Sequence, residues 1–247
     1  METITTNGLV IKQTNYGEAD RILHIFTEKL GIVSVLCKGA RKYKSHQGSA
    51  SQLLYYSSFT LVSGKGMYQM RGASTIESFF SLSESLEKIA LCTYLFDITK
   101  ALVPENMPEQ AVLSLLLNTL YILKTKERDL SLIKAAYELR LLALTGYMAN
   151  CEECCICARG CKAAYFSSSH GGIVCDNCPP PADSIKISSS VQKAMDYITK
   201  NDADKIYSFT ISDDAARELG VACEKFLLSC AERNFLSLDY YKSVCEL

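Results

Sequence analysis

The sequence lacks the motifs that mark the common catalytic sites. It has no phosphate-binding Walker loop, no G-x-S-x-G turn and no H-E-x-x-H helix. Its three histidines are scattered at positions 24, 46 and 170. Because these absences leave no recognisable constellation for acid–base, nucleophilic or metallohydrolase chemistry, we expect that the protein is not an enzyme.

Long hydrophobic runs are missing as well. The first residues, METITTNGLVIKQ, show no basic stretch followed by an apolar one, so we expect no signal peptide. The most apolar window, residues 111–123, is too short to span a bilayer and contains Ser114 and Asn118. We therefore expect a cytoplasmic protein without a membrane span, in which thiols stay reduced.

Cysteine, by contrast, is abundant and clustered. Seven of the twelve cysteines fall within residues 151–178. In a reducing compartment such a cluster indicates metal ligands more than disulfides. The C-x2-C pair Cys175/Cys178 forms one hook, and either Cys151/Cys154 or Cys154/Cys157 can form the other. Both choices fit the spacing of a four-cysteine zinc site.

The residues after each candidate hook favour the second choice. Cys157 is followed by Ala-Arg-Gly, which permits the turn, whereas Cys154 is followed by another cysteine and Cys151 lies close to the end of a predicted helix. We therefore predict that one structural zinc ion is held by Cys154, Cys157, Cys175 and Cys178. A rubredoxin-like iron site and a redox switch that uses the spare thiols stay open as alternatives. The spare thiols are Cys151, Cys155 and Cys161.

The segment between the two hooks, KAAYFSSSHGGIVC, predicts a hairpin. Gly171 and Gly172 allow the chain to turn, and His170 is expected in the loop as a solvated side chain and not a ligand. Four apolar side chains are predicted to cover the metal: Tyr165, Phe166, Ile173 and Val174. A closed four-thiolate site leaves no position for substrate, so we expect it to be structural.

The fold class predicted from the periodicity is α+β. Five short β-branched or aromatic runs lie within residues 7–80, which is typical of a small barrel or sandwich, and we favour a five-stranded barrel of the oligonucleotide-binding (OB) type. The longer segment 39–56 fits the extra element that such barrels carry between their third and fourth strands. We predict an OB-fold DNA-binding domain over residues 1–80 and a helical domain over 81–247, which contains the zinc loop 151–178.

Helical spacing begins after Phe80. The pattern predicts helices over 81–103, 109–124, 130–147, 188–201 and 213–234. On the last of these, Leu219, Cys223, Phe226 and Cys230 share one face. We expect the cysteines outside the zinc loop to be small buried apolar residues. They are Cys37, Cys92, Cys223, Cys230 and Cys245.

The net charge of −1 hides an uneven distribution. Residues 1–80 carry nine basic and five acidic residues, whereas residues 181–247 carry eight basic and eleven acidic ones. Four cations fall within the run KGARKYKS together with Tyr43, which is a pattern suited to phosphates and a stacked base, although a solvated basic loop is the alternative. These cations are Lys38, Arg41, Lys42 and Lys44.

The segment from residue 8 to residue 45 resembles the start of the bacterial RecO recombination-mediator family. The matching features are an acidic turn into Asp20-Arg21, a "T..G" hairpin at Thr27 and Gly31, and a "GAR" segment that begins at Gly39. Ile76-Glu77 and the helices interrupted by the cysteine loop extend the resemblance over nearly the whole chain. One departure is Ala158, a position where the family usually has glycine.

The resemblance implies a DNA repair and recombination mediator. It implies binding of single- and double-stranded DNA, annealing of complementary strands, and work with RecR and single-stranded-DNA-binding protein (SSB) to load RecA at gaps. We expect the KGARKYKS cations to contact DNA, with Lys12, Arg21 and Arg71 as further candidates. The alternative is an interaction scaffold whose helical domain binds the SSB tail or RecR, with Lys134 and Arg140 as a basic rim.

Overall fold

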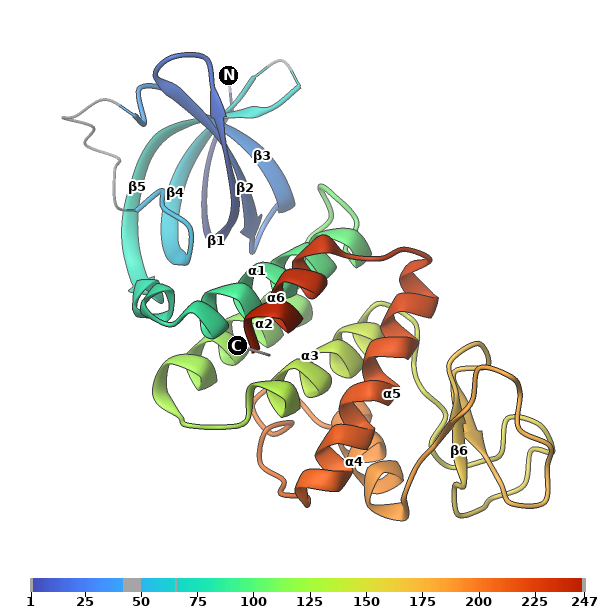
Figure 1. The fold of residues 1–247 in the computed structure, drawn as a ribbon. Helices are drawn as coiled ribbons and strands as arrows, with labels where there is room; N and C mark the ends of the chain where they lie inside the picture. Colours follow the sequence, from blue (N-terminus) through green and yellow to red (C-terminus); the bar gives the residue numbers. More distant parts are fainter. Residues whose placement is uncertain (1, 42–49, 65, 246–247) are drawn as a thin grey trace. The chain divides into compact units, whose positions relative to one another are not determined.

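The chain forms two compact units, and each is described by itself. The computed structural model describes residues 2–41, 50–64 and 66–245. One unit comprises residues 1–113 and 241–247, and the other comprises residues 114–240. The predicted boundary at residue 80 marks the end of the strands, whereas the first unit continues through the helix that follows (Figure 1).

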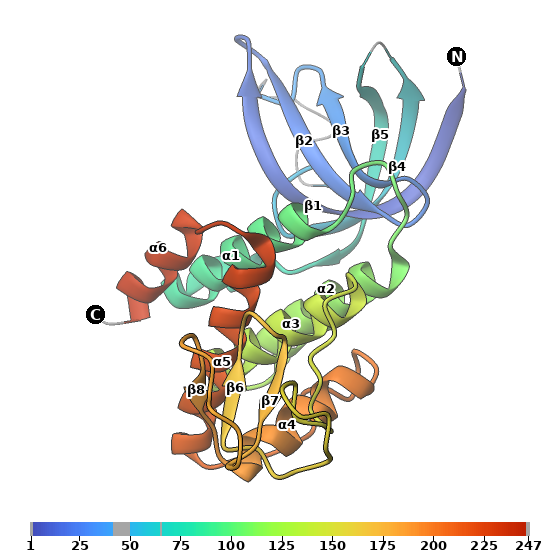
Figure 2. The same ribbon diagram turned by 90° about the vertical axis from the view of Figure 1, so that its right-hand side faces the viewer.

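Five strands close into a barrel in the first unit (Figures 1 and 2). The order around the barrel is β1-β2-β3-β5-β4, and β1 pairs with β4 to complete it. Strands β3 and β5 pair in parallel, whereas the other four strand pairs described for the barrel are antiparallel. This confirms the predicted α+β class with an N-terminal OB-type barrel. The strands are β1 (Thr3–Tyr16), β2 (Asp20–Thr27), β3 (Gly31–Cys37), β4 (Tyr55–Ser63) and β5 (Tyr68–Ser78).

The barrel core follows from the alternation of side chains along each strand. Leu23 and Ile25 on β2 lie in one core cluster with Val33 and Val35 on β3. Side chains at the intervening positions, such as His24, leave the opposite face of the sheet. The outer face of β1, β2 and β3 therefore carries Lys12, His24 and Ser34, which are paired across the three strands.

The turn between β2 and β3 explains the "T..G" pattern. The Thr27 hydroxyl donates to the Gly31 carbonyl at 2.9 Å and accepts the Leu30 N–H at 3.0 Å. Gly31 has φ +70°, and a Cβ at this position would lie 2.0 Å from the carbonyl oxygen of Met107. Only glycine permits both the turn and the close approach of the chain near Met107.

Two helical elements follow the barrel in the first unit. A 3-10 helix covers η1 (Phe80–Glu84) and leads into α1 (Leu86–Leu102). The Ser85 side chain caps α1 by accepting the N–H of Lys88. At the other end of α1, the backbone N–H of Asn106 donates to the carbonyl of Ile32, which ties the following loop to the start of β3.

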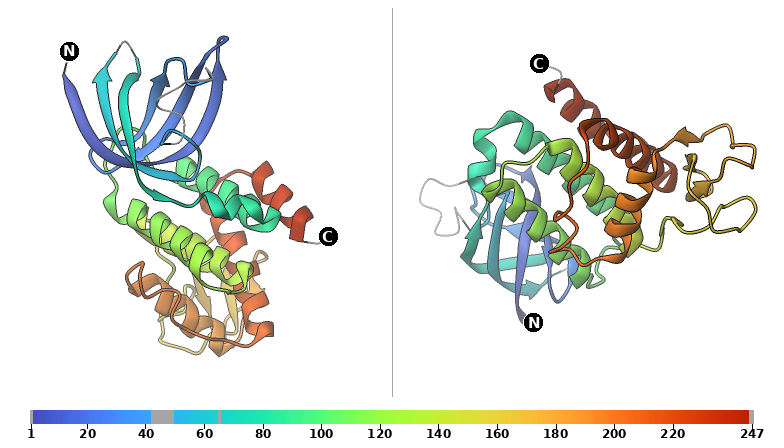
Figure 3. Two further views of the ribbon diagram at one scale, coloured as in Figure 1. Left: turned by 90° about the vertical axis from the view of Figure 1, so that its left-hand side faces the viewer. Right: turned by 90° about the horizontal axis from the view of Figure 1, so that it is seen from below.

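The remaining helices confirm most of the predicted pattern. The third helix ends at Leu144 and not at residue 147, because the Tyr147 N–H bonds back to the Leu142 carbonyl in a closing turn. A final helix from residue 236 was not predicted. In the second unit, α3, α4 and α5 pack on one another (Figure 3). The helices are α2 (Gln110–Thr125), α3 (Leu130–Leu144), α4 (Ser189–Lys200), α5 (Asp213–Ala231) and α6 (Leu236–Cys245).

A small sheet carries the cysteine loop in the second unit (Figure 2). Its strands are β6 (Tyr165–Ser167), β7 (Gly172–Val174) and β8 (Ile185–Lys186), in the order β7-β6-β8. The pairing of β6 with β7 confirms the predicted hairpin, and Gly171 turns the chain with φ +59°. Over the described parts of the chain, no helix combines the length and apolarity needed to cross a membrane.

Candidate functional site

Four of the seven loop cysteines converge on one point. The sulfur atoms of Cys154, Cys157, Cys175 and Cys178 all lie within 4.8 Å of one another. A zinc ion with Zn–S bonds of about 2.3 Å holds tetrahedral sulfurs about 3.8 Å apart. The 3.9 Å separation of the Cys157 and Cys175 sulfurs matches that spacing. The group can therefore hold a metal ion.

Each hook is shaped by backbone hydrogen bonds. In the first, the Ala158 N–H donates to the Cys154 carbonyl at 2.8 Å, and the Cys154 N–H donates to the Arg159 carbonyl at 2.9 Å. In the second, the Cys178 N–H donates to the Cys175 carbonyl at 3.2 Å. Ala158 has φ +55°, a left-handed conformation that explains why glycine suits this position.

The electrostatics of the hooks favour a thiolate. Burial opposes ionisation of Cys154, but N–H groups of Cys175, Cys157 and Ile156 point at its sulfur and lower its pKa to about 6. The sulfur lies 3.4 Å from the Cys175 nitrogen. Hydrogen bonding to the Cys175 sulfur, with burial, raises the pKa of Cys178 to about 12. A bound cation would replace these shared protons, since metal ligation requires thiolates.

The spare cysteines lie around this group but outside it. Cys151 is buried, which raises its pKa to about 12, and its carbonyl accepts a hydrogen bond from Gln192. Cys155 and Cys161 are partly buried and pack against the cluster that contains Cys154. The structure thus places Cys154 and Cys157 in the four-thiol group, whereas Cys151 is buried outside this group.

The hairpin covers the thiols with one face only. Val174 and Tyr165 pack with the cysteines. Phe166 faces the other way and meets Phe226 of α5 edge-on, with ring centroids 5.4 Å apart. Adjacent residues of a strand point to opposite faces, and Ile173 is the cross-strand partner of Phe166. The expectation that all four apolar residues cover the metal was therefore wrong for Phe166 and Ile173.

His170 lies at the tip of the hairpin, away from the four thiols. Its Nδ1 is 3.0 Å from the Ser167 hydroxyl and 3.1 Å from the Ser169 hydroxyl. Asp183 accepts hydrogen bonds from both serines, and these bonds lower its pKa even though burial opposes the shift. The polar group therefore closes the hairpin turn.

Two of the predicted DNA-contacting residues, Lys38 and Arg41, lie at one end of the barrel. The Asp20 carboxylate accepts the N–H of Gly39 at 2.7 Å, and Gly39 has φ +66°. The Arg41 N–H donates to the Ala19 carbonyl at 3.0 Å, and its guanidinium donates to the Gly17 carbonyl at 3.4 Å. These bonds fasten the "GAR" segment to the β1–β2 turn. Lys38 and Arg41 are both exposed there.

The other predicted cations are placed differently. Arg21 is half-buried and lies opposite Cys37 in the sheet, at the same end of the barrel. Lys12 is exposed midway along β1, and Arg71 is exposed on β5. Lys42 and Lys44 lie outside the described residues. The structure therefore brings Lys38, Arg41 and Arg21 to one end and leaves Lys12 and Arg71 on the strands.

Sequence reasoning missed a second basic group on the barrel. The Lys100 ammonium, from the last turn of α1, lies 3.3 Å from the His24 Nδ1. Ser34 is 3.4 Å from the same nitrogen. Residues 24 and 100 are 76 positions apart, so no local pattern signals their contact.

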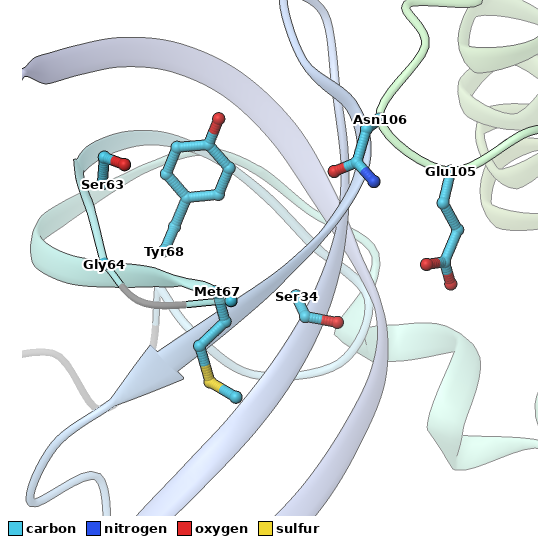
Figure 4. Close-up of a pocket in the computed structure, with 8 residues that line it drawn as sticks. Ser34, Ser63, Gly64, Met67, Tyr68, Glu105 and Asn106 are labelled. Carbon is cyan, nitrogen blue, oxygen red and sulfur yellow. The ribbon is translucent and has the colours of Figure 1, made fainter.

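A pocket of about 240 Å³ opens beside this group (Figure 4). Ser34 belongs to its lining as well as to the His24 group. Tyr68 and Asn106 contribute further polar atoms. The outer face of β3 thus combines a basic group with an adjoining polar hollow.

Lys134, which was predicted to form a basic rim with Arg140, is buried in the second unit. Its side chain is only 6% exposed, and its ammonium contacts Glu138 at 2.9 Å and Glu224 at 2.8 Å. Burial opposes its charge, but the two carboxylates raise its pKa. Lys134 is therefore neutralised inside the second unit and cannot meet an acidic partner. Arg140 is half-buried, and its guanidinium donates to the Thr199 carbonyl.

The chain combines an OB-type barrel, a helical unit and a loop whose four thiols can hold a metal ion, which defines a class of barrel-and-helix proteins with a metal-binding loop. Comparison with known proteins gives the family. The family model for the recombination protein O N terminal matches residues 1–79, and that for the recombination protein O C terminal matches residues 83–239. The chain belongs to the RecO family of DNA repair proteins.

Relatives that align over nearly their whole length are named DNA repair protein RecO. The DNA repair protein RecO of Acetivibrio thermocellus is 36% identical over 246 residues, which cover 99% of this chain and 98% of the relative. That of Dehalococcoides mccartyi strain 195 is 33% identical, over 95% of this chain and 94% of the relative. That of Alkaliphilus metalliredigens is 29% identical, over 98% of this chain and 99% of the relative. The similarity thus includes the barrel, the helices and the cysteine loop.

Proposed function

We propose that this chain is a DNA-binding and strand-annealing mediator that contacts the phosphate backbone through the β1–β2 end of its barrel. The observation that carries the proposal is the fastening of the "GAR" segment by Asp20 and Ala19, which holds Lys38 and Arg41 exposed on a rigid support. Such cations bind phosphates of any sequence and release counterions. Screening of the repulsion between two strands then favours annealing.

The partners follow from the family and form part of the proposal. We infer that the protein acts in the bacterial cytoplasm, at the nucleoid, with RecR and the SSB tail, and assists the loading of RecA. Of the two helical candidates for a basic rim, Arg140 alone is partly exposed, although its guanidinium already donates to the Thr199 carbonyl. Lys42, Lys44 and Arg71 remain predicted contacts to DNA.

We also propose that the metal is zinc and that its role is structural. Four sulfur donors without a nitrogen or oxygen ligand suit zinc, and a closed tetrahedron has no position for a substrate. When bound, the ion cross-links the two hooks. The chain itself supplies the enclosure, through Val174 and Tyr165.

The DNA proposal is tested by charge reversal at the barrel end. We expect Lys38→Glu/Arg41→Glu to weaken binding of a fluorescent single-stranded oligonucleotide about 10- to 100-fold and to reduce the salt slope by about two. Fluorescence anisotropy across salt concentrations measures both quantities. Lys29→Glu is the matched control, because Lys29 is an exposed cation in the β2–β3 turn at the opposite end of the barrel.

Two results would decide against this interface. A folded double variant with unchanged affinity and salt slope would remove Lys38 and Arg41 from it. An equal loss in Lys29→Glu would show that only the overall charge of the barrel matters.

A further inference from the structure

Three side chains from three elements share one patch of the outer barrel face. Lys12 on β1 lies directly opposite His24 on β2, and His24 lies opposite Ser34 on β3. Residues paired in this way leave the same face of a sheet. Their neighbours Leu23 and Val33 are in the core, so the row Lys12–His24–Ser34 faces outward. Lys100 joins the row from α1.

The patch carries more positive than negative charge. Burial lowers the pKa of His24, and the charges of Lys100 and Lys12 lower it further, whereas Glu105 in the loop after α1 opposes them. Neither Lys12 nor Lys100 forms a salt bridge with a carboxylate among the residues that the structure describes. The positive charges of Lys100 and Lys12 therefore both act on one imidazole, and Lys100 contacts it directly.

The hydrogen bonds in the patch leave one ring donor available. Lys100 is an obligate donor, so its contact with the His24 Nδ1 makes this nitrogen an acceptor. The proton of the neutral ring is then on Nε2. An anion that enters the patch can accept from this N–H and from both ammoniums. Once the Lys100 ammonium turns from Nδ1 to the anion, Nδ1 can take up a proton from solvent, and the negative charge of the anion favours this second proton.

The patch lies in line with the barrel end that carries Lys38. Along β3 and its extension, Ser34 and Lys38 are four residues apart, which is about 13 Å. Between them, Thr14, Ile22 and Leu36 form the intervening row on the same face. Tyr16 is 53% exposed at the end of β1 and offers a ring for a base to stack on.

We propose that Lys12, His24 and Lys100 form a second phosphate-binding subsite, along which a single DNA strand held at Lys38 and Arg41 continues across the outer face of β1, β2 and β3. The imidazole takes up a proton as the phosphodiester enters. The inference rests on the proposed function, and it adds a defined path for the strand and a dependence of affinity on pH.

The sign of the pH dependence follows from linkage. The His24 pKa is low in the free protein and higher next to a bound phosphate, so binding takes up a proton between the two values. Affinity for DNA should then fall as the pH rises through this interval. A phosphodiester does not titrate here, so the change in charge belongs to the protein, and His24→Gln shows whether it belongs to this imidazole.

Nuclear magnetic resonance of the full-length wild-type protein tests the proton uptake without a variant. The imidazole signal that is missing in His24→Gln identifies His24. We expect its pKa to rise by about one unit when a thymidine oligonucleotide is bound, which corresponds to about tenfold tighter binding by the protonated ring. An unchanged pKa at saturating oligonucleotide would overturn the proposal.

Anisotropy titrations at constant ionic strength between pH 5.5 and 8 test the subsite itself. The wild type should bind more tightly at low pH, and His24→Gln should lose this dependence. Lys12→Gln/Lys100→Gln should reduce the salt slope by about two, whereas Lys29→Gln should not. Loss of binding in Lys38→Glu/Arg41→Glu with no effect of the subsite variants would leave the proposed function standing and reject the subsite. No effect of either set would reject both.

Discussion

The two units of this protein differ in whether their polar groups are paired within the fold or exposed to solvent. In the second unit, thiols and charges are satisfied within the fold: four cysteines converge on one point, and Lys134 sits between two carboxylates. In the barrel unit, Lys38 and Arg41 are held firmly by the backbone but directed to solvent. A saturated site stabilises its own unit, whereas exposed cations keep their capacity to bind a partner.

The largest effect is expected from loss of the metal site, which tests whether the four thiols stabilise their own unit. We expect Cys154→Ser to abolish stoichiometric zinc binding and to expose the loop 151–178 to proteolysis, because a three-thiol set cannot close the site. Metal analysis and limited proteolysis measure the two effects. Cys151→Ser is the control and should retain the metal, since Cys151 lies outside the four-thiol group.

The same variants separate structure from binding. DNA affinity of folded Cys154→Ser should stay close to that of the wild type. A fall in affinity as large as that of Lys38→Glu/Arg41→Glu would show that the thiol loop contributes to the DNA site, and the contrast between the units would fail.

Lys134→Met should have the next largest effect. It leaves Glu138 and Glu224 close together in a buried place without their shared cation, which costs about 3–5 kcal/mol of unfolding free energy. Urea denaturation at pH 7 measures this loss.

Lys200→Met is the matched control for Lys134→Met. Lys200 also contacts two carboxylates, Glu152 at 2.5 Å and Asp196 at 2.6 Å, but its side chain is 51% exposed. Water screens such pairs, so the loss should be far smaller. Equal losses in the two variants would mean that burial does not set the strength of these ion pairs.

The burial of Lys134 could not be predicted from the sequence. Its partner Glu224 is 90 residues away, so a helical lysine that looked suited to a surface rim is buried by a contact that no local pattern encodes. The contact between His24 and Lys100 was missed for the same reason. Helix α6 was missed because the chain leaves α5 at Glu232 in a left-handed conformation and re-enters a helix only a few residues later.

Local signals, in contrast, were sufficient for much of the fold. The five strands follow from alternation and turn residues, which act over a few positions. The thiol group follows from two C-x-x-C spacings and the turn that each requires. The "GAR" pattern was recognised, but its physical basis, the Asp20 carboxylate on the Gly39 N–H, needed the structure.

Asp20→Ala tests the support of the exposed cations. Removal of a charge-assisted hydrogen bond should cost about 1–2 kcal/mol and should loosen Lys38 and Arg41. We expect DNA affinity to fall several-fold in anisotropy titrations, although the substitution removes a negative charge. Asp20→Asn keeps an acceptor oxygen and should bind DNA at least as well as the wild type. Tighter binding by Asp20→Ala would show that the charge matters more than the support.

Ala158→Gly should have the smallest effect, in the stabilising direction. At φ +55° the alanine Cβ crowds the backbone, and glycine removes this strain at the cost of greater freedom in the unfolded chain. We expect a net gain of about 0.5–1 kcal/mol in the zinc-bound protein, and slower loss of zinc to a chelator, because the first hook is then preformed. Ala182→Gly is the control: Ala182 is exposed in the same unit, it is not among the positive-φ residues, and there glycine should stabilise nothing. If Ala158→Gly released zinc faster than the wild type, the first hook would owe its shape to the alanine side chain and not to the backbone turn that the two hydrogen bonds at Cys154 define.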